Sequence, residues 1–212
     1  MAPRLLPLLA VSTAALTLSG CGVNNIPTKE EYAKTKWADV QAQYQRRADL
    51  IPNLVATVKG YATQEKSVLV EVTQARAKAT SVSVDASTIT DPAKFAQFQQ
   101  SQNQLSGALG RLMVTVEKYP ELKSNENFLA LQHQLEGTEN RITVARKDYN
   151  EAVRVYNTEL HTFPGVLWAS TLYKAEKPMQ QFTATEAAQS APTVSFDQAP
   201  SAAPGSAPPA KK

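Results

Sequence analysis

The chain has 212 residues, of which 42% are hydrophobic and 19% charged, enough for one globular domain with flanking segments. Its formal net charge is only +3, and the bases do not gather into the stripe that nucleic-acid binding requires. A single cysteine excludes an intrachain disulfide and a cysteine metal cluster.

The first 21 residues, MAPRLLPLLAVSTAALTLSGC, are typical of a secretory signal. Arg4 precedes an apolar run over 5–18, which is too short to cross a bilayer because a spanning helix needs about 20 residues. Small residues then lead to Cys21 in "LSGC", which resembles the lipobox of bacterial lipoproteins. We expect a signal peptide over 1–20 and an acylated Cys21 that attaches the protein to a lipid bilayer. An ordinary signal with an incidental cysteine is the alternative.

The residue after the cysteine bears on the expected location. Gly22 stands where lipoproteins retained at the inner membrane of enteric-type cells carry aspartate. We therefore expect the bacterial cell envelope, and the outer membrane facing the periplasm if the cell has two membranes.

Three long helices are predicted after a polar tether over 21–27, because apolar residues recur at three- and four-residue steps. The first helix is expected over 28–80, with Thr28 and Glu31 in capping-box register. The second starts at Asp91 and Pro92 and runs to about 119. The third covers 124–162, where "FPG" ends it, and a short helix follows.

These apolar seams need partners, so we expect an all-α fold over 28–182. The predicted architecture is an elongated antiparallel bundle of three long helices plus a short C-terminal helix. Residues 183–212 are rich in Ala, Pro and Ser, which predicts a disordered tail. Within that tail, "APTVSF" is a segment that could dock on the bundle.

Pro52 lies in the middle of the first helix, where it removes one N–H and its ring clashes with the carbonyl of Ala48. We therefore expect a kink at this point. The freed carbonyls of Ala48 and Asp49 need donors, and Asp49 can itself hold an arginine in a bidentate pair. The candidate donors are Arg46, Arg47, Asn53, Arg141 and Arg146.

The third helix carries a polar stripe beside its apolar seam, formed by Gln132, Glu136, Glu139, Arg146, Asn150 and Asn157. Asparagine has a low helix propensity, so two of them at a spacing of seven need a reason. A buried network that fixes the register of the helices is one reading, and a recognition groove is the other. The candidate polar network or interaction face therefore comprises Arg46, Arg47, Asp49, Asn53, Glu139, Arg141, Arg146, Asn150 and Asn157.

Three stretches resemble the LemA family of bacterial envelope proteins: "QYQRRADLIPNLVATVKGYA", "EKYPELKSNENFLALQHQLEGTENRITVARKDYNEAVRVYN" and "TFPG". The resemblance covers about residues 30–182 and implies a membrane-attached helical bundle whose ectodomain faces outward. Many members begin with an uncleaved transmembrane helix, whereas this chain has the lipobox, so it resembles the lipoprotein branch. The family does not imply a catalytic activity.

Nucleophile elbows, Walker loops and dinucleotide-binding fingerprints are absent from the sequence. His133 and His161 are 28 residues apart on one predicted helix, about 42 Å, too far to share a metal ion. We expect no enzyme, no cofactor and no metal, but a non-catalytic scaffold or binding module with an envelope protein or lipid partner. The alternatives are an envelope hydrolase that uses Asp49 and Glu139, and an accessory subunit of a membrane protease. The partner and the oligomeric state are open.

Overall fold

The computed structural model describes residues 22–82, 85 and 87–183, and all regular structure in this part is helical. This confirms the expected all-α class. The helices belong to one compact unit, which ends at Phe182. Cys21, the predicted signal peptide and "APTVSF" lie outside the described residues. The helices are α2 (Asn25–Tyr61), α3 (Lys66–Ser81), α4 (Pro92–Val116), α5 (Pro120–Lys123), α6 (Glu126–His161) and α7 (Gly165–Thr171).

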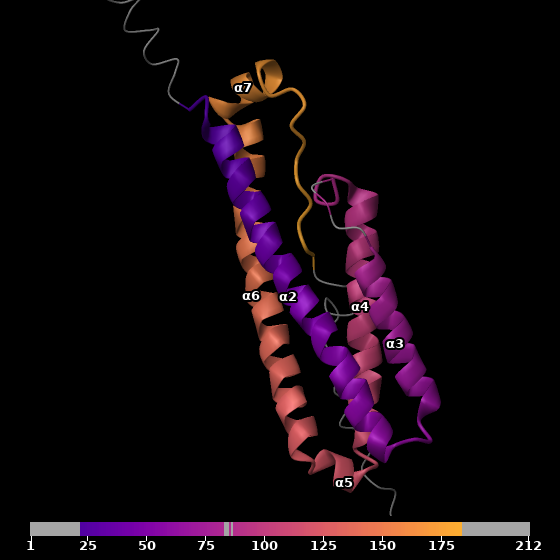
Figure 1. Cartoon of the computed structure of the whole chain (residues 1–212). Coiled ribbons are helices and arrows are strands. Elements are labelled where there is room, and N and C mark those ends of the chain that lie inside the picture. The colour runs from indigo at the N-terminus through magenta and orange to yellow at the C-terminus, as the bar shows by residue number, and fades with distance from the viewer. Residues whose placement is uncertain (1–21, 83–84, 86, 184–212) are drawn as a thin grey trace, which may run out of the picture. The chain divides into compact units, whose positions relative to one another are not determined.

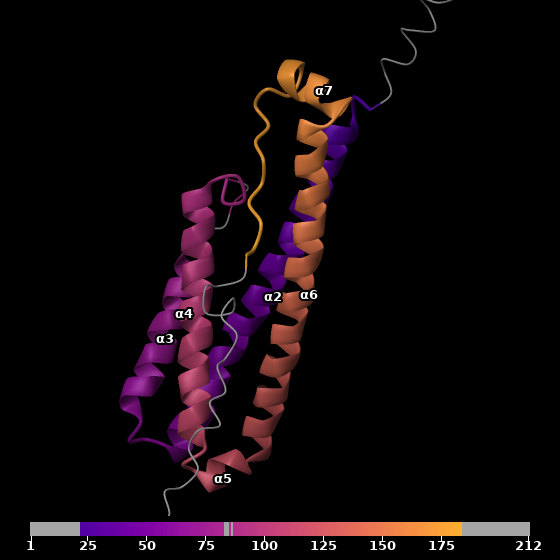
Figure 2. The same cartoon turned by 180° about the vertical axis from the view of Figure 1, so that it is seen from behind.

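Helices α2 and α6 lie side by side and run antiparallel (Figures 1 and 2). At one end Glu159 of α6 pairs with Lys29 and accepts a hydrogen bond from Asn25 Nδ2 at 3.2 Å. At the other end Asn125, which caps α6, donates from Nδ2 to the Tyr61 hydroxyl at 2.9 Å. Polar contacts therefore fix both ends of this pair.

The prediction of one helix over 28–80 is wrong, because α2 ends at Tyr61 and α3 begins at Lys66. The break follows Gly60, which weakens the helix, and Ala62 takes a non-helical conformation with φ −123° and ψ 56°. The reversal lets α3 pack against both α2 and α4. A straight continuation would carry the apolar residues Leu69 and Val72, now buried, away from the core.

Helix α4 begins as expected, with Asp91 as its N-cap and Pro92 at its first position. The Asp91 side chain accepts hydrogen bonds from the backbone N–H groups of Ala93 and Lys94. The helix α3 runs antiparallel to α4, since Glu71 pairs with Arg111 near one end and Ala79 meets Gln102 near the other. The two helices thus form a second antiparallel pair.

Helix α2 begins at Asn25, three residues before the expected start at Thr28, and Thr28 N–H already bonds to the Asn24 carbonyl at 3.1 Å. Residues 22–24 form a turn, so the expected polar tether is largely used by folded structure. At Pro52 the helix continues to Tyr61. The kink there stays a prediction.

The buried side chains form two apolar clusters. The first gathers aromatic residues of α2, α4 and α6 and includes Met179 and Phe182 from beyond α7. The second lies where α2, α3 and α4 meet the beginning of α6, around Ile51, Leu105 and Leu112. Among the described residues, no helix combines the length and apolar character that a membrane span requires.

Gly165 joins α6 to α7 at a very close approach. A Cβ on this residue would stand 2.1 Å from the Glu159 backbone oxygen and 2.9 Å from its Oε1. Only glycine lets α7 turn so tightly against α6.

We predict that Gly165→Ala lowers the free energy of unfolding by at least about 2 kcal/mol, because a backbone oxygen cannot move aside as a flexible side chain can. Gly137→Ala in α6 is the matched control, since nothing lies within 4 Å of its added Cβ. That change should raise stability by up to about 1 kcal/mol through helix propensity. Thermal melting followed by circular dichroism compares the two, and equal effects would contradict the close approach.

Candidate functional site

The segment after α7, residues 176–182, is non-helical and runs back along the bundle. We call it the strap. Figures 1 and 2 show it as an open ribbon, in orange to yellow, that passes alongside α2, α4 and α6. Its backbone is held almost entirely by side chains of α6, the helix with the polar stripe.

Two asparagines of the stripe each bind both backbone groups of one strap residue. Asn157 accepts from the Met179 N–H and donates to the Met179 carbonyl, both at 2.9 Å. Asn150 does the same with Phe182, at 2.9 Å and 2.8 Å. Seven helical residues rise about 10.5 Å, and three residues of nearly extended chain span about 10 Å. The spacing of the asparagines therefore matches the spacing of the strap residues.

Two tyrosines of α6 hold the strap between and beyond these clamps. The Tyr149 hydroxyl donates to the Gln180 carbonyl at 2.8 Å, and the Tyr156 hydroxyl to the Lys177 carbonyl at 3.3 Å. The Gln180 N–H donates to the carbonyl of Ile89, in the turn before α4, at 2.7 Å. Burial raises the pKa of both tyrosines, so their hydroxyls keep their protons and remain donors at neutral pH.

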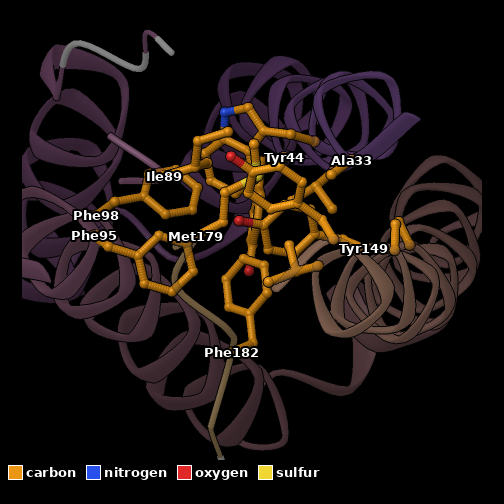
Figure 3. Close-up of a cluster of buried hydrophobic side chains, with 14 of the residues drawn as sticks. Ala33, Tyr44, Ile89, Phe95, Phe98, Tyr149, Met179 and Phe182 are labelled. Atoms are coloured by element: carbon orange, nitrogen blue, oxygen red, sulfur yellow. The ribbon is translucent and has the colours of Figure 1, made fainter. Parts of the chain in front are cut away.

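The strap side chains that point inward enter an aromatic cluster, shown in Figure 3. Met179 is 3% exposed and Phe182 7% exposed. The Phe182 ring centroid lies 5.0 Å from that of Phe95 and 5.6 Å from that of Tyr149. The Arg146 guanidinium stands 4.5 Å from the Phe182 ring centroid, a cation–π distance. The asparagine side chains of the site thus bind the extended backbone of the strap, and the aromatic cluster packs around two apolar side chains of the strap.

A second polar cluster surrounds Arg47, which is 3% exposed and comes from α2. Its Nη1 donates to Ser106 Oγ at 2.8 Å and to Glu139 Oε2 at 2.9 Å, and its Nη2 donates to Gln102 Oε1 at 2.7 Å. Gln102 Nε2 in turn donates to the Ala79 carbonyl at 3.3 Å. One guanidinium therefore links α2 to α4 and α6, and through Gln102 to α3.

The carbonyl that Pro52 leaves without an intrahelical partner has a donor from α3. Arg76 Nε, half-buried, donates to the Ala48 carbonyl oxygen at 2.7 Å. The donor is therefore none of the expected residues, which were Arg46, Arg47, Asn53, Arg141 and Arg146. The Arg47 guanidinium binds residues of α4 and α6, and that of Arg146 lies over the Phe182 ring.

The remaining candidates do not join either cluster. Arg46, Asn53 and Arg141 are exposed. Asp49 is also exposed and accepts a hydrogen bond from Gln45 Nε2 at 2.7 Å, so the expected arginine pair at Asp49 is not formed. An exposed carboxylate on a helix readily forms a hydrogen bond with a side chain four residues away, because helical geometry brings the two together.

The polar stripe of α6 is thus divided between two tasks. Glu139 binds Arg47, whereas Arg146, Asn150 and Asn157 bind the strap. Sequence reasoning missed Arg76, Gln102, Ser106, Met179 and Phe182. A glutamine at a seam position of the second helix was the one signal available, since an amide at a buried seam position needs a partner.

The described residues include no group of three or more His, Cys, Asp and Glu side chains placed to hold a metal ion. Both histidines lie on α6, at positions 133 and 161, and are exposed.

Comparison with known proteins relates this chain to one family. The model of the LemA family matches residues 36–196. Magnetosome protein MamQ 2 of Paramagnetospirillum magneticum is 27% identical over 157 residues, which cover 66% of this chain and 58% of the relative. Protein LemA of Metamycoplasma hominis is 26% identical over 124 residues, covering 58% of this chain and 52% of the relative. The chain thus spans little more than half the length of these curated relatives.

We predict that Arg76 and Pro52 are energetically coupled. Arg76→Met should lower the free energy of unfolding by about 1–3 kcal/mol, because it leaves the Ala48 carbonyl without a donor. In a Pro52→Ala background the restored N–H of residue 52 can bond to that carbonyl, so the cost should fall by at least about 0.5 kcal/mol. Denaturant unfolding of the four proteins measures the cycle. Exposed Arg154→Met is the control, since its pair with Glu151 should cost the same in both backgrounds. An unchanged cost of Arg76→Met would refute the coupling.

Proposed function

Because the chain belongs to the LemA family, we propose that it is a non-catalytic bacterial envelope lipoprotein, anchored through an acylated Cys21. In this proposal the helical bundle is a binding module, and its ligand is an extended peptide segment of another envelope protein. The anchor is supported by the "LSGC" sequence and the single cysteine. Gly22 favours the outer membrane and a periplasmic bundle in a cell with two membranes.

The observation that carries the binding role is the pair of asparagine clamps. Asn150 and Asn157 bind backbone groups, so this part of the recognition does not depend on the ligand's sequence. The buried positions that Met179 and Phe182 occupy favour a ligand with two large apolar residues three positions apart. Main-chain hydrogen bonds combined with side-chain pockets are how other proteins bind extended peptides. The strap fills this site in cis, at the high effective concentration of a tethered ligand. An incoming segment must therefore displace it.

The geometry does not favour the hydrolase alternative. A pair of catalytic carboxylates should share a pocket and lack other partners. Glu139 is paired with Arg47, and Asp49 is bonded by Gln45. The cavity beside Glu139, about 360 Å³, is lined by Leu109, Met113 and Leu135 among others, and Asp49 is not among its lining residues.

The anchor is tested by metabolic labelling with a radioactive fatty acid. We predict that the full chain incorporates label and sediments with membranes, and that Cys21→Ser loses both properties. Ser19→Ala, which keeps a small residue before the cysteine, is the control and should behave like the unchanged protein. Label on the Cys21→Ser protein would contradict the proposed anchor.

The binding role is tested with a labelled peptide of residues 174–182, KAEKPMQQF, added to the full chain. The double variant Met179→Asp, Phe182→Asp should release its own strap and leave the site free. We expect it to bind the peptide at least about tenfold more tightly than the unchanged chain does. Fluorescence anisotropy measures both affinities. A peptide carrying the same two aspartates should not bind.

The clamp itself is tested by adding Asn157→Asp to the freed variant. Aspartate still accepts from the peptide N–H but cannot donate to its carbonyl, so affinity should fall about tenfold, equivalent to about 1.4 kcal/mol. Asn140→Asp, exposed on the same helix, should have no effect. If the freed variant keeps its helical circular dichroism and binds no peptide, the site serves only to hold its own strap.

A further inference from the structure

One end of the bundle presents an apolar surface around α7. Among the described residues, four of the large apolar side chains that are clearly exposed fall within ten positions of the chain. They are Phe163 at 79% exposure, Val166 at 40%, Leu167 at 51% and Leu172 at 66%. The other exposed apolar residues are spread over α2, α3, α4 and α6. We call residues 163–172 the α7 face.

The inner side of α7 packs against the bundle, so the exposed apolar side chains cannot turn into the core. Trp168 and Ala169 pack against the first apolar cluster. Gly165 is buried against the end of α6. The exposed side chains of the α7 face therefore point away from the bundle, because its inner positions are already occupied. Water solvates them unless a lipid or protein surface covers them.

The chain enters the bundle beside the same surface. A Cβ on Gly22 would stand 3.3 Å from Pro164 Cγ, so Gly22 lies against the start of α7. The turn at 22–24 and the contacts of Asn25 and Lys29 with Glu159 hold this entry point to the end of α6. Figures 1 and 2 both show the beginning of α2 next to α7.

Cys21 precedes Gly22 directly, and consecutive Cα atoms are about 3.8 Å apart. The residues expected to form a flexible tether are part of the turn at 22–24 and of α2. An acyl chain on Cys21 must therefore enter the bilayer close to α7. A short connection of this kind holds the α7 end of the bundle at the lipid surface. Exposed Lys174 and Lys177 follow the α7 face, as basic residues commonly flank helices that lie in the interface.

We propose that the α7 face inserts into the interface of the bilayer, with Phe163, Leu167 and Leu172 among the lipids. This inference rests on the proposed acylation of Cys21. The occupant is a lipid surface and not a protein, because the patch lies at the point where the anchored chain leaves the bundle. Insertion fixes the α7 end at the membrane and directs the opposite end, with α5, away from it.

The test uses the acylated full chain in phospholipid vesicles that contain spin-labelled lipid. The acylated Cys21 has no free thiol, so Leu167→Cys provides a single site for an environment-sensitive fluorophore. Val144→Cys is the matched control, because Val144 is similarly exposed, at 58%, but lies in the middle of α6. We expect lipid quenching at position 167 to exceed that at position 144 by at least fivefold, together with a blue-shifted emission.

The possible failures are distinguishable. Intact mass spectrometry of the same sample reports acylation, and a sample without the acyl mass overturns both the anchor and this inference. With the acyl mass present, equal quenching at positions 167 and 144 overturns the inference alone. Blue-shifted emission at 167 without lipid quenching also overturns it, because the α7 face is then covered by protein.

Discussion

A buried guanidinium divides the interior of this protein. On α2, Arg47 lies between Tyr44 of the first apolar cluster and Ile51 of the second. On α4 its partner Gln102 lies between Phe98 and Leu105, which again belong to the two clusters. On α6 Glu139 separates Leu135 from Ile142 in the same way. A charged group that is removed from water needs all its partners in place, so this layer fixes the register in which the helices meet.

The strap shows how backbone groups can be satisfied without a β-sheet. A non-helical segment that packs against helices cannot leave its N–H and C=O groups unpaired in the core. Here the amides of Asn150 and Asn157 supply both a donor and an acceptor to one strap residue each, as a neighbouring strand would. Asparagine is poorly suited to a helix interior in solvent, and its place in α6 is explained by this contact.

The sequence predicted what depends on local pattern and missed what depends on long-range pairing. The apolar period of α4 and α6, the cap at Asp91 and the polar stripe of α6 could all be read from neighbouring residues. The chain reversal after Tyr61 could not be predicted in this way, because the apolar spacing continues across it. What determines the reversal is the packing of Leu69 and Val72 against other helices. The same holds for Arg76, which is 28 residues away from the carbonyl it serves. The strap was missed because its apolar residues are too few to form a period of their own.

The strap contributes Met179 and Phe182 to the first apolar cluster and nothing to the second. With the polar layer of Arg47 between them, the two clusters do not share side chains. If the strap departs, as the proposed function requires, the first cluster loses two of its members and the second keeps all of its own. A removable segment would thus complete the first cluster in this proposal, whereas helices and their connections alone close the second, and the polar contacts of Arg47 between them include no strap residue.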